Sequence, residues 1–485
     1  MTGLQGLLAA WPYLIAVLHG AIALGATGHA VLHKRDTRAA IGWAGAIWLA
    51  PILGALLYVW LGINRIERRA RDLRTKRPRR GPYDGVGAGS AGALDRALAP
   101  AGAHLEPLVR LVGEVTRTPL VAGNGITPLI DGDGAYPAMI EAIEAASRSV
   151  TLIAYIFAND GAGRRFLEAL RGAVARGVEV RVIVDDVGAR YGWPSMPRAL
   201  RKAGVPVARF LSTLIPWRFR YSNLRTHRKI LVVDGRIGFT GGMNISEGNC
   251  RNRGPRRPIR DLHFRVTGPV VAHLQAAFAE DWAFCTGELL QGERWFPALE
   301  PTGSVLARGI ADGPDEDFEK LRLTILGAVA CARWSILIVT PYFLPDLSLI
   351  TALNVAALRG VEVDIVLPAE NDQRLVKWAS TALLGQVLER GCRVWLSPPP
   401  FDHTKLMVVD GLWTLFGSAN WDPRSLRLNF EFDVECYDRE LGALLVEHAR
   451  AKMNRSRRVH LAEIDGRRLP IQLRDGVARL LSPYL

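Results

Sequence analysis

The chain contains the same short motif twice, and this repetition constrains its fold more than any other feature. The first copy consists of His227, Lys229, Asp234, Gly241 and Asn244. The second copy lies 176 residues later and has the same residue types at the same spacing, at His403, Lys405, Asp410, Gly417 and Asn420. A single such pattern arises by chance in roughly one chain of this length in several thousand, and two in register far less often. The chain is therefore predicted to contain two related halves, each with one copy.

The residues of each motif suit a phosphate group. An aliphatic run follows the lysine in both copies, which predicts a strand, and residues two apart on a strand share a face. His227 and Lys229 should therefore point to the same side, and the glycine before Asn244 lets a ligand approach the backbone. An imidazole can attack phosphorus or carry a proton, while ammonium and amide groups hold its oxygens. Ser418 is a further candidate phosphate ligand, although its counterpart in the first copy is Gly242.

The two motif aspartates have two possible roles. Asp234 and Asp410 belong to the predicted catalytic set together with the histidines and lysines. Each also precedes a glycine, and Asp-Gly is a strong signal for a tight hairpin turn. A role in the turn is at least as well supported as direct chemistry.

The pattern between and around the motifs predicts an α/β fold. Short β-branched runs alternate with helical stretches rich in Ala, Leu and Arg from about residue 120, which favours an α/β sandwich. The predicted strands and helix include 150–157, 164–175, 178–184, 336–340 and 361–367. The predicted divisions are a transmembrane hairpin at 1–64, a basic segment and linker at 65–118, and two α/β halves at 119–300 and 301–485 that share one active site.

Two N-terminal stretches are long enough to cross a bilayer, which takes roughly 20 apolar residues. They are Trp11 to Leu32 and Ala39 to Leu61, neither of which contains a formal charge, and Pro51 is expected to kink the second. A cleaved signal peptide fits poorly because no basic segment precedes the first stretch. Two buried helices of a globular domain also fit poorly, because neither stretch has a polar stripe. We expect a membrane hairpin.

The positive charge is unevenly distributed. Of the formal net charge of +14, the segment from Lys34 to Arg80 carries 12 basic and 3 acidic residues. Dense basic residues beside a membrane span face the cytoplasm, so both termini and the large C-terminal part should be cytoplasmic. Such a cluster also binds anionic lipid head groups. Because little excess charge remains beyond Arg80, a basic face for nucleic acid is not indicated.

The cysteines give no sign of a metal or a disulfide framework. All five are scattered, without a Cys-x-x-Cys pair or a histidine at zinc-ligand spacing. We expect no metal and no cofactor.

A further segment, Ile215 to Tyr221, interleaves aromatic and basic residues in a way that suits a lipid interface, and an ordinary strand with exposed arginines explains it equally well.

At these motifs the sequence resembles the phospholipase D superfamily, whose signature is a duplicated HxK(x)4D motif with a downstream asparagine. Within that superfamily it is similar to the bacterial cardiolipin synthases over nearly the whole chain. The resemblance is carried by YIFANDGAGRRF from Tyr155, DDVGARYG from Asp185, THRKILVVDGRIGFTGGMNI from Thr226, RDLHFRVTGP from Arg260, TPYFLPD from Thr340 and GSANWDPRSLRLNFE from Gly417.

The resemblance implies a reaction in two displacements without a metal. One histidine attacks the phosphodiester and becomes phosphorylated while the other protonates the departing alcohol, and a second alcohol then displaces the enzyme. By this resemblance His227 is assigned as the nucleophile and His403 as the general acid and base. Similar enzymes have an acidic residue downstream of each motif that orients a histidine. The matching residues are Asp261 and Glu431, which lie 34 and 28 residues beyond their histidines.

The expected reaction joins two phosphatidylglycerol molecules into cardiolipin and releases glycerol. The donor can also be phosphatidylethanolamine, and the run of prolines at 398–400 before His403 puts the second substrate in question. A lipid hydrolase that uses water in the second step is the nearest alternative, and a membrane-tethered nuclease is a more distant one. The sequence gives no indication of oligomeric state or of a regulator.

Overall fold

The computed structural model describes residues 2–34, 37–62, 98, 101–190, 194–211, 224–314 and 319–482. Three predicted features lie outside these residues. They are the basic cluster from Arg65 to Arg80, most of the linker that follows it, and the segment from Ile215 to Tyr221.

One mixed sheet runs through the body of the protein and comprises 16 strands in the described part of the chain, one of which, β5 (Arg225–Thr226), lies off the main strand order and pairs with β17. The first half contributes β1 (Val121–Ile130), β2 (Ser149–Ala154), β3 (Glu179–Asp185), β4 (Val207–Phe210), β6 (Ile230–Val233), β7 (Ile237–Gly241) and β9 (Leu262–Thr267). The second half contributes β10 (Val305–Asp312), β11 (Ser335–Val339), β12 (Glu362–Pro368), β13 (Arg393–Ser397), β15 (Leu406–Val409), β16 (Trp413–Gly417), β17 (Asn429–Tyr437) and β18 (Arg457–Val459). The predicted α/β class and strand positions are confirmed.

The strand order shows the internal repeat. From its outer edge the first half runs β4-β3-β2-β6-β7-β9-β1, and the second half continues from β10 as β17-β16-β15-β11-β12-β13-β18. Strands β2, β3 and β4 pair in parallel, as do β11, β12 and β13, while each motif strand forms an antiparallel hairpin with the strand after it. The halves join where β1 pairs antiparallel with β10. The two motif strands, β6 and β15, therefore occupy equivalent places on either side of this junction.

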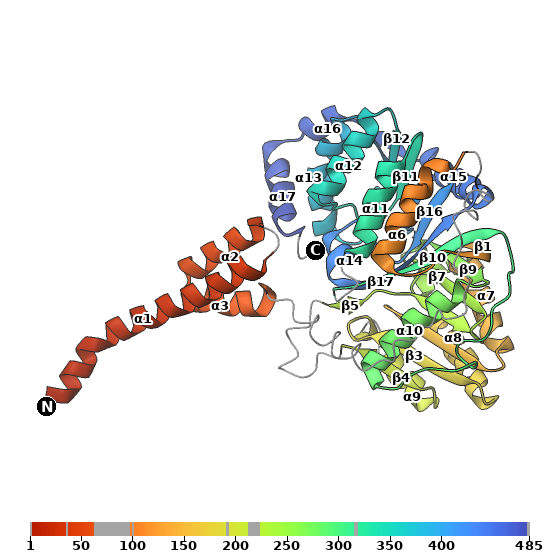
Figure 1. Cartoon of the computed structure of the whole chain (residues 1–485), viewed down its shortest axis with the longest axis horizontal. Coiled ribbons are helices and arrows are strands. Elements are labelled where there is room, and N and C mark those ends of the chain that lie inside the picture. The colour runs from red at the N-terminus through yellow and green to blue at the C-terminus, as the bar shows by residue number, and fades with distance from the viewer. Residues whose placement is uncertain are drawn as a thin grey trace.

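Helices cover both faces of the sheet (Figure 1). In the first half they are α7 (Asp131–Ala145), α8 (Gly161–Ala175), α9 (Met196–Lys202) and α10 (Val271–Thr286). The remainder are α6 (Glu106–Thr116), α11 (Lys320–Cys331), α12 (Leu347–Leu358), α13 (Arg374–Leu388), α14 (Pro423–Arg427), α15 (Arg439–Met453), α16 (Leu461–Asp465) and α17 (Leu469–Leu480). One core cluster draws residues from both halves, including the rings of Phe264 and Phe416, whose centroids are 3.6 Å apart. The halves thus share a hydrophobic core.

The N-terminal segment forms an arm of helices (Figure 1). It consists of α1 (Thr2–His33), α2 (Thr37–Leu49), α3 (Pro51–Leu57) and a π-helical turn (Tyr58–Gly62). Among the described residues, one helix, from Trp11 to His33, is long and apolar enough to cross a membrane. The second predicted stretch is interrupted at Ala50, because Pro51 lacks an N–H and clashes with the preceding turn. It forms two shorter apolar helices, and the kink expected at Pro51 is found there.

Candidate active site

Each motif histidine is held by a strand from the opposite half of the chain. The short strand β5 (Arg225–Thr226) pairs in parallel with the start of β17, and the His227 N–H donates to the Phe430 carbonyl at 2.8 Å. In the same way, β14 (Phe401–Asp402) pairs with β8 (Ile259–Arg260), and the His403 N–H donates to the Arg260 carbonyl at 2.8 Å. These bonds bring each histidine next to the acidic residue of the other half.

Each imidazole contacts a buried carboxylate through Nδ1. His227 Nδ1 lies 2.9 and 3.0 Å from the two carboxylate oxygens of Glu431, and His403 Nδ1 lies 2.8 Å from Asp261 Oδ2. The family resemblance implied both acids as partners of the histidines. The structure pairs them across the halves, because the acid downstream of one motif contacts the histidine of the other. A carboxylate on Nδ1 fixes the tautomer and leaves Nε2 as the reacting nitrogen.

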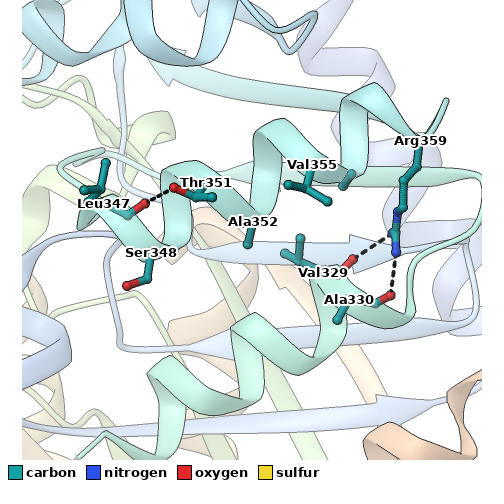
Figure 2. Close-up of a pocket in the computed structure, with 9 residues that line it drawn as sticks. Val329, Ala330, Leu347, Ser348, Thr351, Ala352, Val355 and Arg359 are labelled. Atoms are coloured by element: carbon teal, nitrogen blue, oxygen red, sulfur yellow. Dashed lines mark hydrogen bonds between the residues drawn. The ribbon is translucent and has the colours of Figure 1, made fainter.

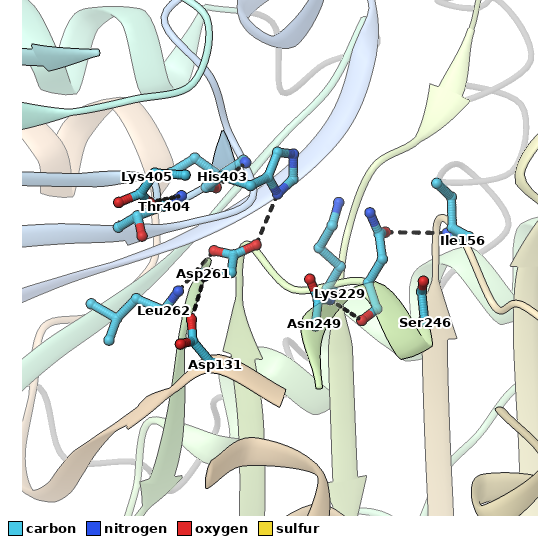
Figure 3. Close-up of polar contacts among 12 residues, drawn as sticks. Asp131, Ile156, Lys229, Ser246, Asn249, Asp261, Leu262, His403, Thr404 and Lys405 are labelled. Atoms are coloured by element: carbon cyan, nitrogen blue, oxygen red, sulfur yellow. Dashed lines mark hydrogen bonds and ion pairs between the residues drawn. The ribbon is translucent and has the colours of Figure 1, made fainter. Parts of the chain in front are cut away.

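The two lysines place their charges in the same buried region. Lys229 and Lys405 are 3% and 5% exposed, and each Nζ donates to the carbonyl of its own histidine at 2.6 Å. Burial lowers the pKa of Lys229 to about 7 and that of Lys405 to about 8. Figure 3 shows Lys229 and His403, which come from different halves, projecting into one region beside Asp261.

Burial and neighbouring positive charge lower the pKa of both histidines. The pKa of His227 lies well below its usual value because the ring is buried, with Lys229, Lys405 and His403 adding to the effect. The pKa of His403 is also lowered, first by burial and then by Lys405, while Asp261 opposes the shift. Charged groups of both motif copies lower the pKa of His227, so the two copies lie close enough to interact electrostatically.

The carboxylate of Glu431 has its own buried partners. Ser418 Oγ donates to Glu431 Oε2 at 2.5 Å and accepts from the Phe432 N–H at 3.0 Å, while Asn429 Nδ2 donates to Glu431 Oε1 at 3.1 Å. Burial raises the pKa of Glu431 to about 7. Ser418 was a candidate phosphate ligand, but its hydroxyl is fully buried and engaged with Glu431. These contacts suit Ser418 to position the carboxylate beside His227, and its role as a phosphate ligand stays a prediction.

The first half achieves the same arrangement with a shorter acid and a glycine. Asp261 Oδ1 accepts a hydrogen bond from the N–H of Leu262 at 2.8 Å. In the second half, Ser418 Oγ accepts the corresponding bond from the N–H of Phe432. A Cβ atom at Gly242 would lie 2.4 Å from Asp261 Oδ1. Gly242 and Ser418 occupy equivalent positions but cannot be exchanged, because each fits the length of its neighbouring acid.

The two motif asparagines lie at the site in different settings. Asn244 Oδ1 accepts from the Ile156 N–H at 3.2 Å, and its backbone carbonyl accepts from Asn249 Nδ2 at 3.0 Å and from the Tyr136 hydroxyl. Asn420 Nδ2 donates to Ser425 Oγ at 3.2 Å, and its buried Oδ1 has no partner among the described residues. Oδ1 is thus engaged in Asn244 and has no partner in Asn420 among the described residues.

The motif aspartates lie at the other end of the motif strands. Asp234 accepts hydrogen bonds from the N–H groups of Ser147, Arg148 and Ser149, and Asp410 accepts from those of Arg333, Trp334 and Ser335. Both aspartates have positive φ, 52° and 56°, as a tight turn requires. This geometry favours the hairpin-turn alternative. The catalytic role predicted for Asp234 and Asp410 stays a prediction.

Some residues that build the site were missed in the sequence. The guanidinium of Arg228 is buried and donates to Asp281 Oδ1 at 2.8 Å and to the Glu431 carbonyl at 3.0 Å, linking the first motif to the other half. Asp433 is buried beside the site, and burial raises its pKa to about 8. The repeat did not mark either residue, because Arg228 corresponds to Thr404 and Asp433 corresponds to His263, which are residues of other types.

A surface groove lies away from these residues. It is an apolar surface groove of about 590 Å³ between α11 and α12 (Figure 2), and Arg359 at one end donates to the carbonyls of Val329, Ala330 and Ala332. None of the predicted site residues lines it. These bonds make Arg359 a cap for the last turn of α11.

Comparison with known proteins places these features in context. A family model described as "Cardiolipin synthase, PLD-like domain" matches residues 139–282 and 325–455, which contain His227 and His403 respectively. Cardiolipin synthase A of Pseudomonas fluorescens is 34% identical over 483 residues, and that of Pseudomonas entomophila is 32% identical over 480 residues; each alignment covers 98% of both chains. The solved phosphatidylserine synthase of Haemophilus influenzae has the same fold, with a TM-score of 0.61 at 15% identity, covering 78% of this chain and 100% of that chain.

Proposed function

Because the chain belongs to the cardiolipin synthase family of proteins with phospholipase D-like domains, we propose that it is a phosphatidyltransferase that makes cardiolipin. The reaction transfers a phosphatidyl group from one phosphatidylglycerol to the terminal hydroxyl of another and releases glycerol. One observation carries the proposal: each motif histidine is bound through Nδ1 to a buried carboxylate of the opposite half.

In the first displacement, Nε2 of His227 attacks the phosphorus of the donor lipid. A phosphorus–nitrogen bond forms, and the bond from phosphorus to the oxygen of the head-group glycerol breaks. That oxygen takes a proton from Nε2 of His403. Burial and the nearby lysines lower the pKa of His227, which favours its neutral, nucleophilic form. Asp261 favours the protonated form of His403, as a general acid requires.

In the second displacement, the terminal hydroxyl of another phosphatidylglycerol gives its proton to His403 and its oxygen attacks the phosphorus. The phosphorus–nitrogen bond breaks, which yields cardiolipin and restores His227. Lys229, Lys405 and the two motif asparagines hold the non-bridging oxygens as charge develops on them. Loss of one such preorganised donor typically costs about 3–4 kcal/mol of transition-state stabilisation.

The N-terminal helices anchor this chemistry to its substrates. We assign residues 1–64 to a membrane hairpin, 65–118 to a basic segment and linker, and 119–300 and 301–485 to two halves that form one active site. The catalytic part is cytoplasmic, at a bacterial inner membrane. The apolar length of the helix from Trp11 to His33 supports this anchor, and confinement to the bilayer raises the frequency with which lipids and site meet.

Incubating the purified chain with phosphatidylglycerol vesicles tests the function. We expect cardiolipin and free glycerol in equal amounts, and neither product from His227→Ala or His403→Ala. Phosphatidic acid as the main product would instead identify a hydrolase that uses water in the second step. Cleavage of DNA without any lipid product would exclude both lipid reactions. Including phosphatidylethanolamine in the vesicles and measuring released ethanolamine identifies the donor.

A further inference from the structure

The last helix, α17, exposes apolar side chains that a helix of a globular domain normally buries. Leu469, Leu473, Val477 and Leu480 are 66%, 60%, 60% and 74% exposed. Their spacing of four, four and three residues places them on one face of the helix. A continuous apolar stripe therefore runs along the outer side of α17, which is the reverse of the usual amphipathic arrangement.

The contacts of the opposite face fix this orientation. Asp475 is 1% exposed and accepts a hydrogen bond from Arg474 at 2.8 Å and another from Arg467. Ala478 is buried in the core of the second half, and the guanidinium of Arg474 lies over the ring of Trp378 on α13 at 4.5 Å from its centroid. The polar and small residues of α17 thus face the protein, and the helix cannot rotate to bury its leucines without breaking these contacts.

Positive charge surrounds the same helix. The segment from Arg450 to Ser482 contains nine basic and three acidic residues, whereas the 369 residues from Gly81 to Ala449 carry 40 basic and 41 acidic residues. The excess charge of the catalytic part is therefore confined to its last elements. Its exposed members are Arg450, Arg455, Arg457, Arg458, Arg468, Arg474 and Arg479.

We propose that α17, with the exposed arginines from Arg450 to Arg479, is a membrane-binding surface that lies against an anionic phospholipid bilayer. An exposed apolar stripe inserts into the boundary between head groups and acyl chains, and basic residues beside it bind anionic head groups. Figure 1 shows α17 on the side of the body from which the N-terminal helices extend. This surface goes beyond the proposed reaction, because it gives the catalytic body a second contact with the membrane.

A second copy of the chain is the main rival for this surface. A two-fold symmetric contact would place the arginines of one α17 beside those of the other, and like charges across an interface oppose association. An anionic bilayer covers the leucines and neutralises the arginines together. The charge pattern therefore favours lipid over self-association.

Photocrosslinking of the full-length chain in nanodiscs tests the proposal. A benzophenone amino acid replaces Leu473, and the discs contain either phosphatidylcholine alone or a mixture with phosphatidylglycerol. The matched control has the same replacement at Leu289, which is 52% exposed but lies in the first half, in a segment without the basic cluster. We expect phospholipid adducts at position 473 in the mixed discs, at a yield roughly fivefold or more above position 289.

Removing charge provides a second arm of the test. Arg468→Gln and Arg479→Gln together should lower the adduct yield at position 473 in the mixed discs toward that in phosphatidylcholine discs, by up to about fivefold for each arginine. Both side chains are exposed, so the fold should be retained, which circular dichroism checks. Equal yields at 473 and 289 would overturn the proposal, as would crosslinks from 473 to a second copy or to another segment of the chain.

The same discs separate this inference from the proposed reaction. Cardiolipin formation without lipid adducts at position 473 would exclude the membrane-binding surface and leave the proposed reaction standing. Lipid adducts without cardiolipin formation would support the surface and contradict the reaction.

Discussion

At the scale of single residues, the two halves of the site solve the same problem with different side chains. A buried carboxylate must be held beside each histidine, and the first half does this with Asp261 next to Gly242, whereas the second half uses Glu431 next to Ser418. The proposed reaction assigns unequal roles to the two histidines, and unequal supports are consistent with that difference. Both supports are sensitive to small changes in volume.

Gly242→Ala should disrupt the first support. The added Cβ would lie 2.4 Å from Asp261 Oδ1, so the carboxylate must move away from His403 and from the Leu262 N–H. Loss of such a supporting contact typically lowers activity by about 10–100-fold. Cardiolipin formation measures the effect. Gly172→Ala in α8, where the nearest atom is 3.5 Å away at the end of an arginine side chain, is the matched control and should retain activity. Equal activity of both variants would contradict the role of Asp261.

The assignment of the two histidines predicts different responses to an improved leaving group. A phosphatidyl ester of p-nitrophenol needs no proton donor, because nitrophenolate departs unprotonated. His403→Ala should therefore still release nitrophenol in a first turnover and form the phosphorylated enzyme, while His227→Ala should do neither. A rapid burst of nitrophenol and the mass of the intact protein measure both steps. A burst with His227→Ala but not with His403→Ala would reverse the assignment.

Asp433 predicts a pH-dependent stability. Burial raises its pKa to about 8, so between about pH 4 and pH 8 the folded chain binds a proton that the unfolded chain does not. This contribution to stability is present at low pH and is lost as the pH rises toward 8. Asp433→Asn should therefore raise the melting temperature more at pH 8.5 than at pH 5. Thermal melts of both proteins in the same detergent isolate this residue from the titrating lysines. A gain that does not grow with pH would contradict the shift.

At the scale of elements, the motif strand separates chemistry from structure. The histidine lies before the start of β6 or β15, and the aspartate lies just after its end. There the aspartate binds three consecutive N–H groups at the start of the strand that pairs with it, β2 or β11. The strand, the turn and the neighbouring strand are thereby fixed together. The conserved spacing within each repeat thus serves both the reaction and the hairpin.

Asp234→Ala should accordingly destabilise the protein without removing the reaction. Three backbone donors lose their acceptor, which should lower the free energy of unfolding by about 1–3 kcal/mol. Asp234→Asn retains one acceptor oxygen and should lie between Asp234→Ala and the unaltered chain. Denaturant melts measure stability, and kcat at a temperature well below the transition should stay within a few-fold of that of the unaltered chain. A loss of more than about 100-fold in kcat from a folded Asp234→Ala variant would instead support a catalytic role for Asp234.

Repetition explains which parts of the site could be predicted. His227, Lys229 and Asn244 stood out because the same types recur 176 residues later, and an aliphatic run after the lysine indicated the strand. The crossed pairing could not be predicted, because it depends on β5 and β14 pairing with strands some 200 and 140 residues away in sequence. Arg228 was missed because its contacts are all with distant segments and its counterpart is a threonine.

Composition predicted the N-terminal segment less well. The absence of charge from Ala39 to Leu61 predicts a single span with a kink at Pro51, but a count of apolar residues does not predict that one helix ends there and another begins. The structure has helices on both sides of Ala50. Local backbone chemistry at Pro51 therefore decided what hydropathy alone did not.

At the scale of the whole molecule, a single sheet makes the two halves one folding unit. Strands β1 and β10 form the junction, and β10 pairs with β17 over seven residues, from Leu306 with Tyr437 to Asp312 with Glu431. The pairing of the junction strand β10 therefore extends to Glu431, whose carboxylate lies beside His227. A change at the junction should affect both halves and the site together.

The buried ion pair between Arg308 and Glu435 tests this coupling. Arg308 Nε lies 2.8 Å from Glu435 Oε1, both side chains are at most 1% exposed, and Trp413 Nε1 donates to the other Glu435 oxygen at 3.0 Å. Arg308→Met leaves a buried charge unpaired and should cost roughly 3–5 kcal/mol. Arg308→Met with Glu435→Gln removes that charge but keeps an acceptor for Trp413, and should recover most of the loss. Hydrogen exchange in both halves should accelerate together in the single variant. Faster exchange in the second half alone would show that the junction does not couple the halves.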